Sequence, residues 1–570
     1  MSSSSSQAGE AAAEREAHSL DSQEGQIGDE LRDLTLEDRQ PSASSLSEAG
    51  GGGDGGEGGA TAAAGEASTL FECEDEEEAA AATGDLPQAG AGTPPAELAA
   101  ALRAATSAAS EAAPAPGEAA ADAALRHQPK HVFVFSTAGK PIYAYRKDEA
   151  ALAGLMATAE AILSVAHSKG HTLRHIRVGS HVFAFLERPP LCLVGVSAYG
   201  EPPAVLRMQL SLVHGQIVSL LTSSALTHMF ERNPGYDARR LLAGSEGMLC
   251  SLIDSFTATP AALLGAYPSL PLLGGVRQAL LASLAAAVKA TGAVHGVVVA
   301  GGAVAAACPA PGAAPLQQWD LLLLLNLLSS NQSFRHSGDA MTPVCLPRFN
   351  PAANLHAYIH YSDGATQTAT VLLCGGMPDP GALAAAQQRM QQQLEAIGVL
   401  QALISSAAAE QHMAASNGGS GGNGGSSSSS SSSSSAVTSL LAVPSLPTAA
   451  GGGRFGATPL LHFVYKLSAR QQYVMAPFSQ PLLAGGLQQP ITVAYSQLRA
   501  AMFEGSAGSG GPLQRLRFEA RPRVTLLGAV TGDTELYLAL DPLTDKAEAA
   551  GVAGRLGMWL FARHDQLFSL

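Results

Sequence analysis

Apolar and polar residues follow two patterns along residues 130–570, and the order of these patterns repeats three times. Short apolar runs rich in β-branched and aromatic residues predict strands. Apolar stripes at spacings of three and four residues predict helices. The first repeat opens with strands at 131–135 and 141–145, which turn at Gly139 as a hairpin. After the hairpin we predict a helix at 148–169, strands at 172–178, 181–187 and 191–199, and helical segments at 202–230 and 236–256.

The second and third repeats show the same order of predicted elements, strand, strand, helix, strand, strand, strand, helix. The second begins with a hairpin of small residues around Gly301 and Gly302. Its predicted elements are strands at 294–300 and 303–308, a helix at 316–330, strands at 342–349, 355–361 and 367–374, and a Gln-rich helix at 380–404. The third has predicted strands at 460–467 and 472–476, a helix at 492–503, strands at 513–518, 523–530 and 534–540, and a closing helix from Asp541 and Pro542 to about His564.

Each repeat therefore predicts an α+β domain, in which a five-stranded antiparallel sheet is flanked by helices. Sequence identity between the repeats is negligible, so what repeats is topology. The predicted division is a leader at 1–129, domains at 130–256, 257–410 and 456–570, and a Ser/Gly-rich linker at 411–455.

Charge is distributed unevenly, and this changes how the whole-chain value is interpreted. Residues 1–130 hold 25 acidic and 6 basic side chains, so the formal net charge of −15 describes the leader. The leader has too few large apolar residues to offset the entropy of ordering, and we expect it to be disordered. The acidic run at 72–78 is either a solvating segment or a docking motif. Ten consecutive serines within 416–435 predict a flexible linker.

Composition also bears on compartment. No uninterrupted apolar run reaches the length of a membrane span, and the Ser-rich, acidic start does not resemble a secretory signal. We therefore expect a cytosolic or nuclear protein. The six cysteines are scattered without a CxxC pair, which predicts reduced thiols.

The motifs that could carry catalysis lack the context that each chemistry needs. The glycines at 451, 453 and 456 satisfy GxGxxG but precede a predicted strand rather than a helix. His167, His171 and His175 are spaced like metal ligands, but Gly170 interrupts the helix. His356 and His360 share a strand face without a nearby carboxylate. The near-neutral remainder of the chain lacks a basic stripe interleaved with aromatics, so we expect no nucleic acid, metal or cofactor.

Four separated segments resemble a known family. They are HVFVFSTAGKPIYAY at 131–145, YDARRLLAGSE at 236–246, TPVCLPRFN at 342–350 and TGDTELYLALDPLT at 531–544. In this order they resemble the SAND-type vacuolar fusion proteins, the Mon subunit of the Mon/Ccz complex. The resemblance covers about 130–570 and implies three longin-like domains. The Ser/Gly insertion, the Ala-rich segment around 97–125 and the Gly/Ala-rich opening of the second domain depart from the family pattern.

The resemblance also implies a function. It implies a guanine-nucleotide exchange factor subunit without a bond-making active site, which pairs with a Ccz-type longin protein and activates a late-endosomal Rab GTPase. The first domain would pair with its counterpart in Ccz and form the GTPase-facing surface. Further implied partners are an early-endosomal Rab and an anionic phosphoinositide membrane, with a cytosolic protein recruited peripherally to late endosomes and vacuoles. A non-catalytic longin scaffold or tether is the alternative, and an enzyme with a dispersed site is a third class.

Two segments supply interface candidates. Around the first hairpin they are the exposed residues Lys140, Tyr143, Tyr145, Arg146 and Lys147, although Tyr143 could equally pack inside and Lys147 could be a solvated charge. In the second segment, Asp237 can cap a helix whose Leu241, Leu242 and Met248 are buried. Alternatively, Arg239 and Arg240 bind a partner carboxylate.

Overall fold

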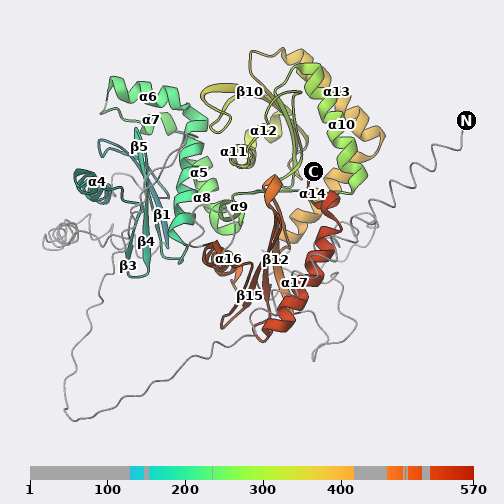
Figure 1. Ribbon diagram of the computed structural model, residues 1–570. Helices are drawn as coiled ribbons and strands as arrows, with labels where there is room; N and C mark the ends of the chain where they lie inside the picture. The colour runs from blue at the N-terminus through green and yellow to red at the C-terminus, as the bar shows by residue number, and fades with distance from the viewer. Residues whose placement is uncertain are drawn as a thin grey trace, which may run out of the picture.

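The computed structural model describes residues 129–146, 153–233, 235–415, 459–478, 482, 485–503 and 514–569. These residues form three layered α+β units, each with one sheet between helices (Figure 1). The predicted disorder of the leader, the predicted flexible linker at 416–435 and the glycine motif at 451–456 lie outside the described residues.

The first domain is a five-stranded antiparallel sheet of order β2-β1-β5-β4-β3. All seven residues of β1 are buried because both faces of the sheet are covered. Val132 and Val134 pack toward α5 and α8, while Phe133 and Phe135 pack toward α4. The elements are β1 Lys130–Ser136, β2 Pro141–Ala144, α4 Ala153–Ser168, β3 His175–Val178, β4 His181–Arg188, β5 Leu191–Ser197, α5 Pro203–Leu221, α6 Ser223–Arg232, α7 Arg239–Leu242 and α8 Glu246–Ala258.

Among the described residues, α5 is long and apolar enough to cross a membrane, but it is a core helix of this domain. It packs on β4 and β5, and more than half of it is buried. The helix ends at Thr222, whose left-handed φ of 61° starts the separate helix α6, so the single helical segment predicted at 202–230 is two helices.

The second domain has a five-stranded antiparallel sheet of order β8-β7-β11-β10-β9. One face is covered by α10, α13 and α14, and the other by α11. The elements are α10 Gly274–Thr291, β7 His295–Ala300, β8 Ala303–Pro309, α11 Gln318–Ser330, α12 Gln332–Ser337, β9 Asp339–Leu346, β10 Asn350–Asp363, β11 Thr368–Cys374, α13 Pro380–Ala396 and α14 Val399–Ala415. Helix α10 has no counterpart in the sequence prediction. The single Gln-rich helix predicted there is two helices, separated at Gly398 with φ +71°.

The third domain departs from the predicted five-stranded sheet, because its sheet has six strands in the order β14-β15-β16-β12-β13-β6. The additional strand β6, Tyr267–Pro268, runs parallel to β13 and comes from the segment between the first two domains. The other elements are β12 Leu460–Leu467, β13 Gln472–Met475, α16 Gln488–Phe503, β14 Leu516–Ala520, β15 Thr525–Thr531, β16 Thr534–Leu540, α17 Lys546–Phe561 and α18 His564–Leu567. The closing helix starts at Lys546 rather than at Asp541, and Asp545 caps it by accepting from the Glu548 amide.

The connector between α8 and α10 joins all three domains. It contains α9, Ala261–Leu264, and β6, and it lies between the three sheets (Figure 1). Ala262 belongs to the core of the first domain, whereas Leu263 and Leu264 pack into the third. Ser269 then bridges to Val304 of the second domain. A short segment therefore contributes to three cores in turn.

Candidate partner interface

The hairpin of β1 and β2 lies against the C-terminal helices of its own domain. The Lys140 ammonium donates to the carbonyl of Gly235, just before α7. The Tyr143 hydroxyl lies 3.2 Å from the Cys250 sulfur on α8. Burial, reinforced by Cys250, raises the pKa of Tyr143 well above its usual range, so its hydroxyl stays neutral.

Tyr143 and Tyr145 are 2% and 9% exposed, so the expectation that these two residues are exposed is wrong. The physical reason is that β2 is an edge strand covered by α7 and α8, which the linear sequence does not place there. The structure thus favours the packing alternative for Tyr143. Lys147 lies outside the described residues.

Arg146 ends the hairpin and remains at the surface. One guanidinium nitrogen lies 2.8 Å from both carboxylate oxygens of Asp254 on α8, and the two side chains are 53% and 43% exposed. Its φ of 53° is in the left-handed region that non-glycine residues rarely adopt. The guanidinium also lies 5.1 Å from the ring centre of Tyr145, whose hydroxyl donates to the same carboxylate. The strained backbone is therefore held by a charge pair and a ring contact.

Arg239 and Arg240 begin α7, and both are exposed. The Arg239 guanidinium donates to both oxygens of Asp237 at 2.8 and 2.7 Å. This hydrogen bonding lowers the pKa of the Asp237 carboxyl to about 2. Asp237 also accepts from the Arg239 backbone amide at 3.2 Å, but it is not the N-cap residue predicted from the sequence, because Ala238 occupies that position. Leu242 is buried, while Leu241 and Met248 are partly buried.

The hairpin end and α7 thus present Arg146, Arg239 and Arg240 from one domain, with Asp237 and Asp254 beside them. Exposed pairs of this kind contribute little to stability, so their carboxylates and guanidiniums can exchange partners at low cost. This arrangement can bind a charged surface; it does not place a nucleophile beside a base.

Asp254 is the residue that the sequence analysis missed. It stands near the C-terminal end of α8, where the helix dipole disfavours a carboxylate. Glu246, the other acid of this helix, lies in the first turn, where a carboxylate is favoured, so an acid near the opposite end is a signal for a cationic partner. That partner is Arg146, 108 residues earlier in the chain.

The remaining chemistry candidates are occupied by local contacts. His167 pairs with Glu187 at 3.0 Å, and His175 lies in β3. His360 does have a nearby carboxylate, contrary to expectation, because β9 places Asp339 2.6 Å from its Nδ1. No group of three metal-ligating side chains occurs within the described ranges. The five described cysteines are free thiols, and Cys73 lies outside these ranges.

Comparison with known proteins agrees with this architecture domain by domain. Residues 130–252, 291–392 and 459–563 match, respectively, the first, second and third longin domains of FUZ, MON1 and HPS1. The protein is thus a triple-longin protein.

Relatives that align with most of the chain show which family of triple-longin proteins it belongs to. The chain is 32% identical over 453 residues to the vacuolar fusion protein MON1 homolog A of Bos taurus, covering 80% of this chain and 73% of the relative. It is also 32% identical over 440 residues to the MON1 homolog of Arabidopsis thaliana, covering 76% and 68%. Identity to protein SAND of Takifugu rubripes is 32% over 449 residues, covering 78% and 77%. The chain belongs to the MON1/SAND family of vacuolar fusion proteins.

Proposed function

We propose that this protein acts in fusion at the vacuole or lysosome, as one subunit of a heterodimeric exchange factor for a late-endosomal Rab GTPase. The observation that carries the proposal is the in-order match of all three longin domains, together with the relatives named as vacuolar fusion proteins. The second subunit is a Ccz-type longin protein.

Exchange of this kind requires an interface rather than a bond-making site. A factor that binds the nucleotide-free GTPase more tightly than the loaded form shifts the equilibrium toward release by that difference in affinity. Ordered switch segments of a GTPase are displaced when a partner surface stabilises their open arrangement.

The first domain supplies candidate residues for this surface. Arg146, Arg239 and Arg240 are exposed cations on its hairpin and on α7, next to carboxylates that can be exchanged for those of a partner. The open edge strand β3, with Val178 51% exposed, offers a separate backbone pairing surface in the same domain.

Recruitment to membranes completes the proposal. An early-endosomal Rab and anionic phosphoinositides bring the complex from the cytosol to late endosomes and vacuoles, where it is peripherally bound. The acidic leader is a candidate for regulating this step, since like charge opposes approach to an anionic surface.

The test is release of a fluorescent guanine nucleotide from the late-endosomal Rab. We expect the full chain in complex with the Ccz-type protein to accelerate release strongly, and the chain alone to be a poor exchange factor. A complex that forms but leaves release unchanged would favour the scaffold alternative. Full activity of the isolated, monomeric chain would instead refute the heterodimer. An early-endosomal Rab serves as the control GTPase and should not be exchanged.

A further inference from the structure

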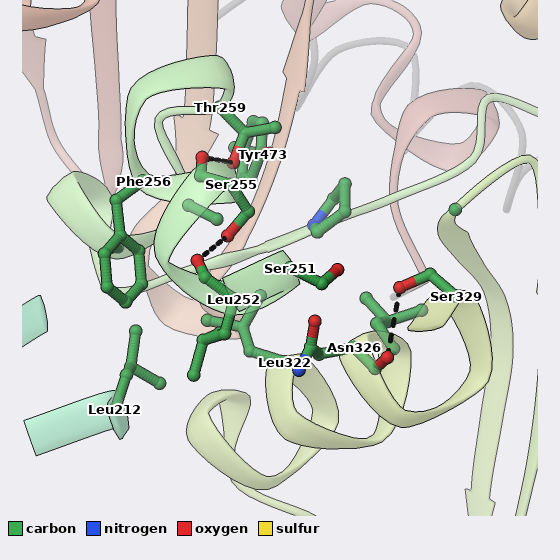
Figure 2. Close-up of a pocket in the computed structure, with 15 residues that line it drawn as sticks. Leu212, Ser251, Leu252, Ser255, Phe256, Thr259, Leu322, Asn326, Ser329 and Tyr473 are labelled. Atoms are coloured by element: carbon green, nitrogen blue, oxygen red, sulfur yellow. Dashed lines mark hydrogen bonds between the residues drawn. The ribbon is translucent and has the colours of Figure 1, made fainter. Parts of the chain in front are cut away.

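A cavity of about 160 Å³ lies where the three domains meet around the connector (Figure 2). Ser329 and Gly302 are exposed and mark its mouth. Its walls are mainly apolar and come from every part of the fold: Leu212 from α5, Leu252 and Phe256 from α8, Ala262 from α9, Leu322 from α11 and Tyr473 from β13.

The polar side chains in the wall differ in whether they have a hydrogen-bond partner within the protein. The Ser255 hydroxyl donates to the Leu252 carbonyl at 2.6 Å, and the Ser329 hydroxyl donates to the Asn326 carbonyl at 3.1 Å. These two hydroxyls therefore need nothing from a ligand. The Ser251 hydroxyl, in contrast, has no hydrogen-bond partner within the part of the chain that the structure describes.

Asn326 carries the strongest signal, because the orientation of its buried carboxamide is chemically fixed. Its Nδ2 donates to Gln216 Oε1 at 2.9 Å and to the Met248 carbonyl at 3.0 Å. The Gln216 amide is itself oriented, since its Nε2 donates to the Ser219 hydroxyl at 2.8 Å. Asn326 Oδ1 must therefore point the other way, into the cavity and toward Ser251 (Figure 2).

The side chain of Asn326 is only 7% exposed, and its Oδ1 accepts no hydrogen bond from the described residues. This oxygen is not completely enclosed by the protein, so a molecule in the cavity can reach it and donate a hydrogen bond to it. An apolar wall with one such acceptor suits a molecule that is apolar except for one donor group.

We propose that this cavity is a binding site for a small neutral molecule with one apolar ring and one hydrogen-bond donor. The ring fills the space between Leu252, Phe256 and Leu322, and the donor bonds to Asn326 Oδ1 with Ser251 beside it. The size is appropriate, since an apolar cavity of about 150 Å³ in another protein holds benzene. Because all three domains form the walls, an occupant also stabilises their mutual arrangement.

Phenol is the probe, and benzene is its matched control because it has the same ring without the donor. Binding to the full chain is followed by saturation-transfer NMR and by the melting temperature. We expect saturable phenol binding that raises the melting temperature, and about three- to tenfold weaker binding of benzene, the contribution typical of one hydrogen bond.

Two variants test the location. Ser251→Leu places a larger side chain in the cavity without removing a hydrogen bond found in the structure, and Ser329→Phe covers the mouth from an exposed position. Both should abolish phenol binding, while Ser251→Ala should retain it. If Ser251→Leu fails to fold, Ser329→Phe decides alone.

Three results would overturn the proposal: no saturable binding to the unmodified chain, undiminished binding to a folded blocking variant, or equal affinities for phenol and benzene. Nucleotide release by the complex is independent of these measurements, so failure here leaves the exchange proposal unaffected.

Discussion

At the scale of single residues, the charges on the first domain fall into two groups with different consequences. Lys130 and Glu201 are 5% and 4% exposed and pair at 2.9 Å inside the core, where Gln209 and Ser197 complete the hydrogen bonding. Arg146 and Arg239 form ion pairs at the surface instead, with Asp254 and Asp237 respectively. Loss of one partner inside leaves a buried charge uncompensated, whereas the surface pairs are screened by water.

The surface group gives a prediction for partner binding. Reversing both arginines, Arg239→Glu with Arg240→Glu, should change the free energy of unfolding by less than about 1 kcal/mol, as is typical for exposed pairs. Co-purification with the proposed Ccz-type partner should weaken, because charges at the rim of an interface act mainly on association. Arg389→Glu with Arg555→Glu, exposed on α13 and α17, is the matched control. A large fall in melting temperature would show that α7 needs these charges to hold its place.

His462 gives a prediction for pH. It is fully buried between Phe478 and Tyr495, and burial lowers the pKa of its imidazole from 6.5 to about 3. Below pH 6.5 the unfolded chain binds a proton that the folded chain does not, so stability is full above 6.5 and declines toward pH 3. Burial lowers the pKa of His214 in the same direction, to about 4.

We therefore expect His462 to lower the free energy of unfolding by on the order of 3 kcal/mol between pH 6.5 and pH 4. His462→Phe keeps a ring against Phe478, and in this variant the free energy of unfolding should depend less on pH between 6.5 and 4. The measurement is urea unfolding at both pH values for both proteins. Parallel profiles of the two proteins would exclude His462 as the cause.

At the scale of elements, helices approach the sheets where a strand carries glycine. A Cβ on Gly195 of β5 would lie 3.2 Å from the Leu210 side chain of α5. On Gly296 of β7 it would lie 2.7 Å from Val288 and 2.8 Å from Leu284, both buried on α10. Because glycine has no Cβ, each helix can pack close to the sheet at these two strand positions.

Gly296→Ala should consequently destabilise the second domain by about 1–3 kcal/mol, the usual cost of overpacking a core. Gly247→Ala on α8 is the control, because a Cβ there meets nothing within 4 Å and should be neutral or stabilising by up to about 1 kcal/mol. Thermal unfolding of both variants makes the comparison. If the two variants had the same melting temperature, helix α10 would have to move away from the sheet easily.

At the scale of the whole molecule, Arg277 joins the second and third domains. Its guanidinium is 3% exposed and donates to the carbonyls of Ala305, Leu270 and Gln566 at 2.7, 2.6 and 3.1 Å. These acceptors belong to β8, to the connector and to the C-terminal segment. Burial lowers the pKa of Arg277 to about 10, which still leaves it charged at neutral pH.

Arg277→Met should lower the melting temperature and separate the unfolding of the third domain from that of the second. The reason is that each buried carbonyl left without a donor costs about 1–3 kcal/mol. Lys289→Met, on the exposed side of the same helix, is the control. This variant should unfold in a single transition at an unchanged temperature. Scanning calorimetry distinguishes one transition from two. A single unshifted transition in Arg277→Met would mean that the remaining contacts, such as the Ser269 hydroxyl donating to the Leu567 carbonyl, couple the domains without Arg277.

The sequence by itself determined the local elements of this protein. Alternation and helical spacing depend on which residues are apolar, and they located β1 and β2, the strands of the second repeat and β12 to within a few residues. Gly139, Gly301 and Gly302 marked hairpin turns because they adopt positive φ, at 74°, 61° and 81°. The four family segments added the longin fold, which the matches to all three domains confirm.

Only the tertiary structure decided what lies between those elements. Strand β6 is two residues long and pairs with a sheet about 200 residues away, so no local pattern could predict it. Helix α10 is rich in alanine and has little contrast between its faces. Tyr143 is buried because α7 and α8 cover the β2 edge, and Asn326 faces a cavity because Gln216 and Met248 hold its amide. Such features depend on which distant residues meet, and contacts between distant residues form only when the chain folds.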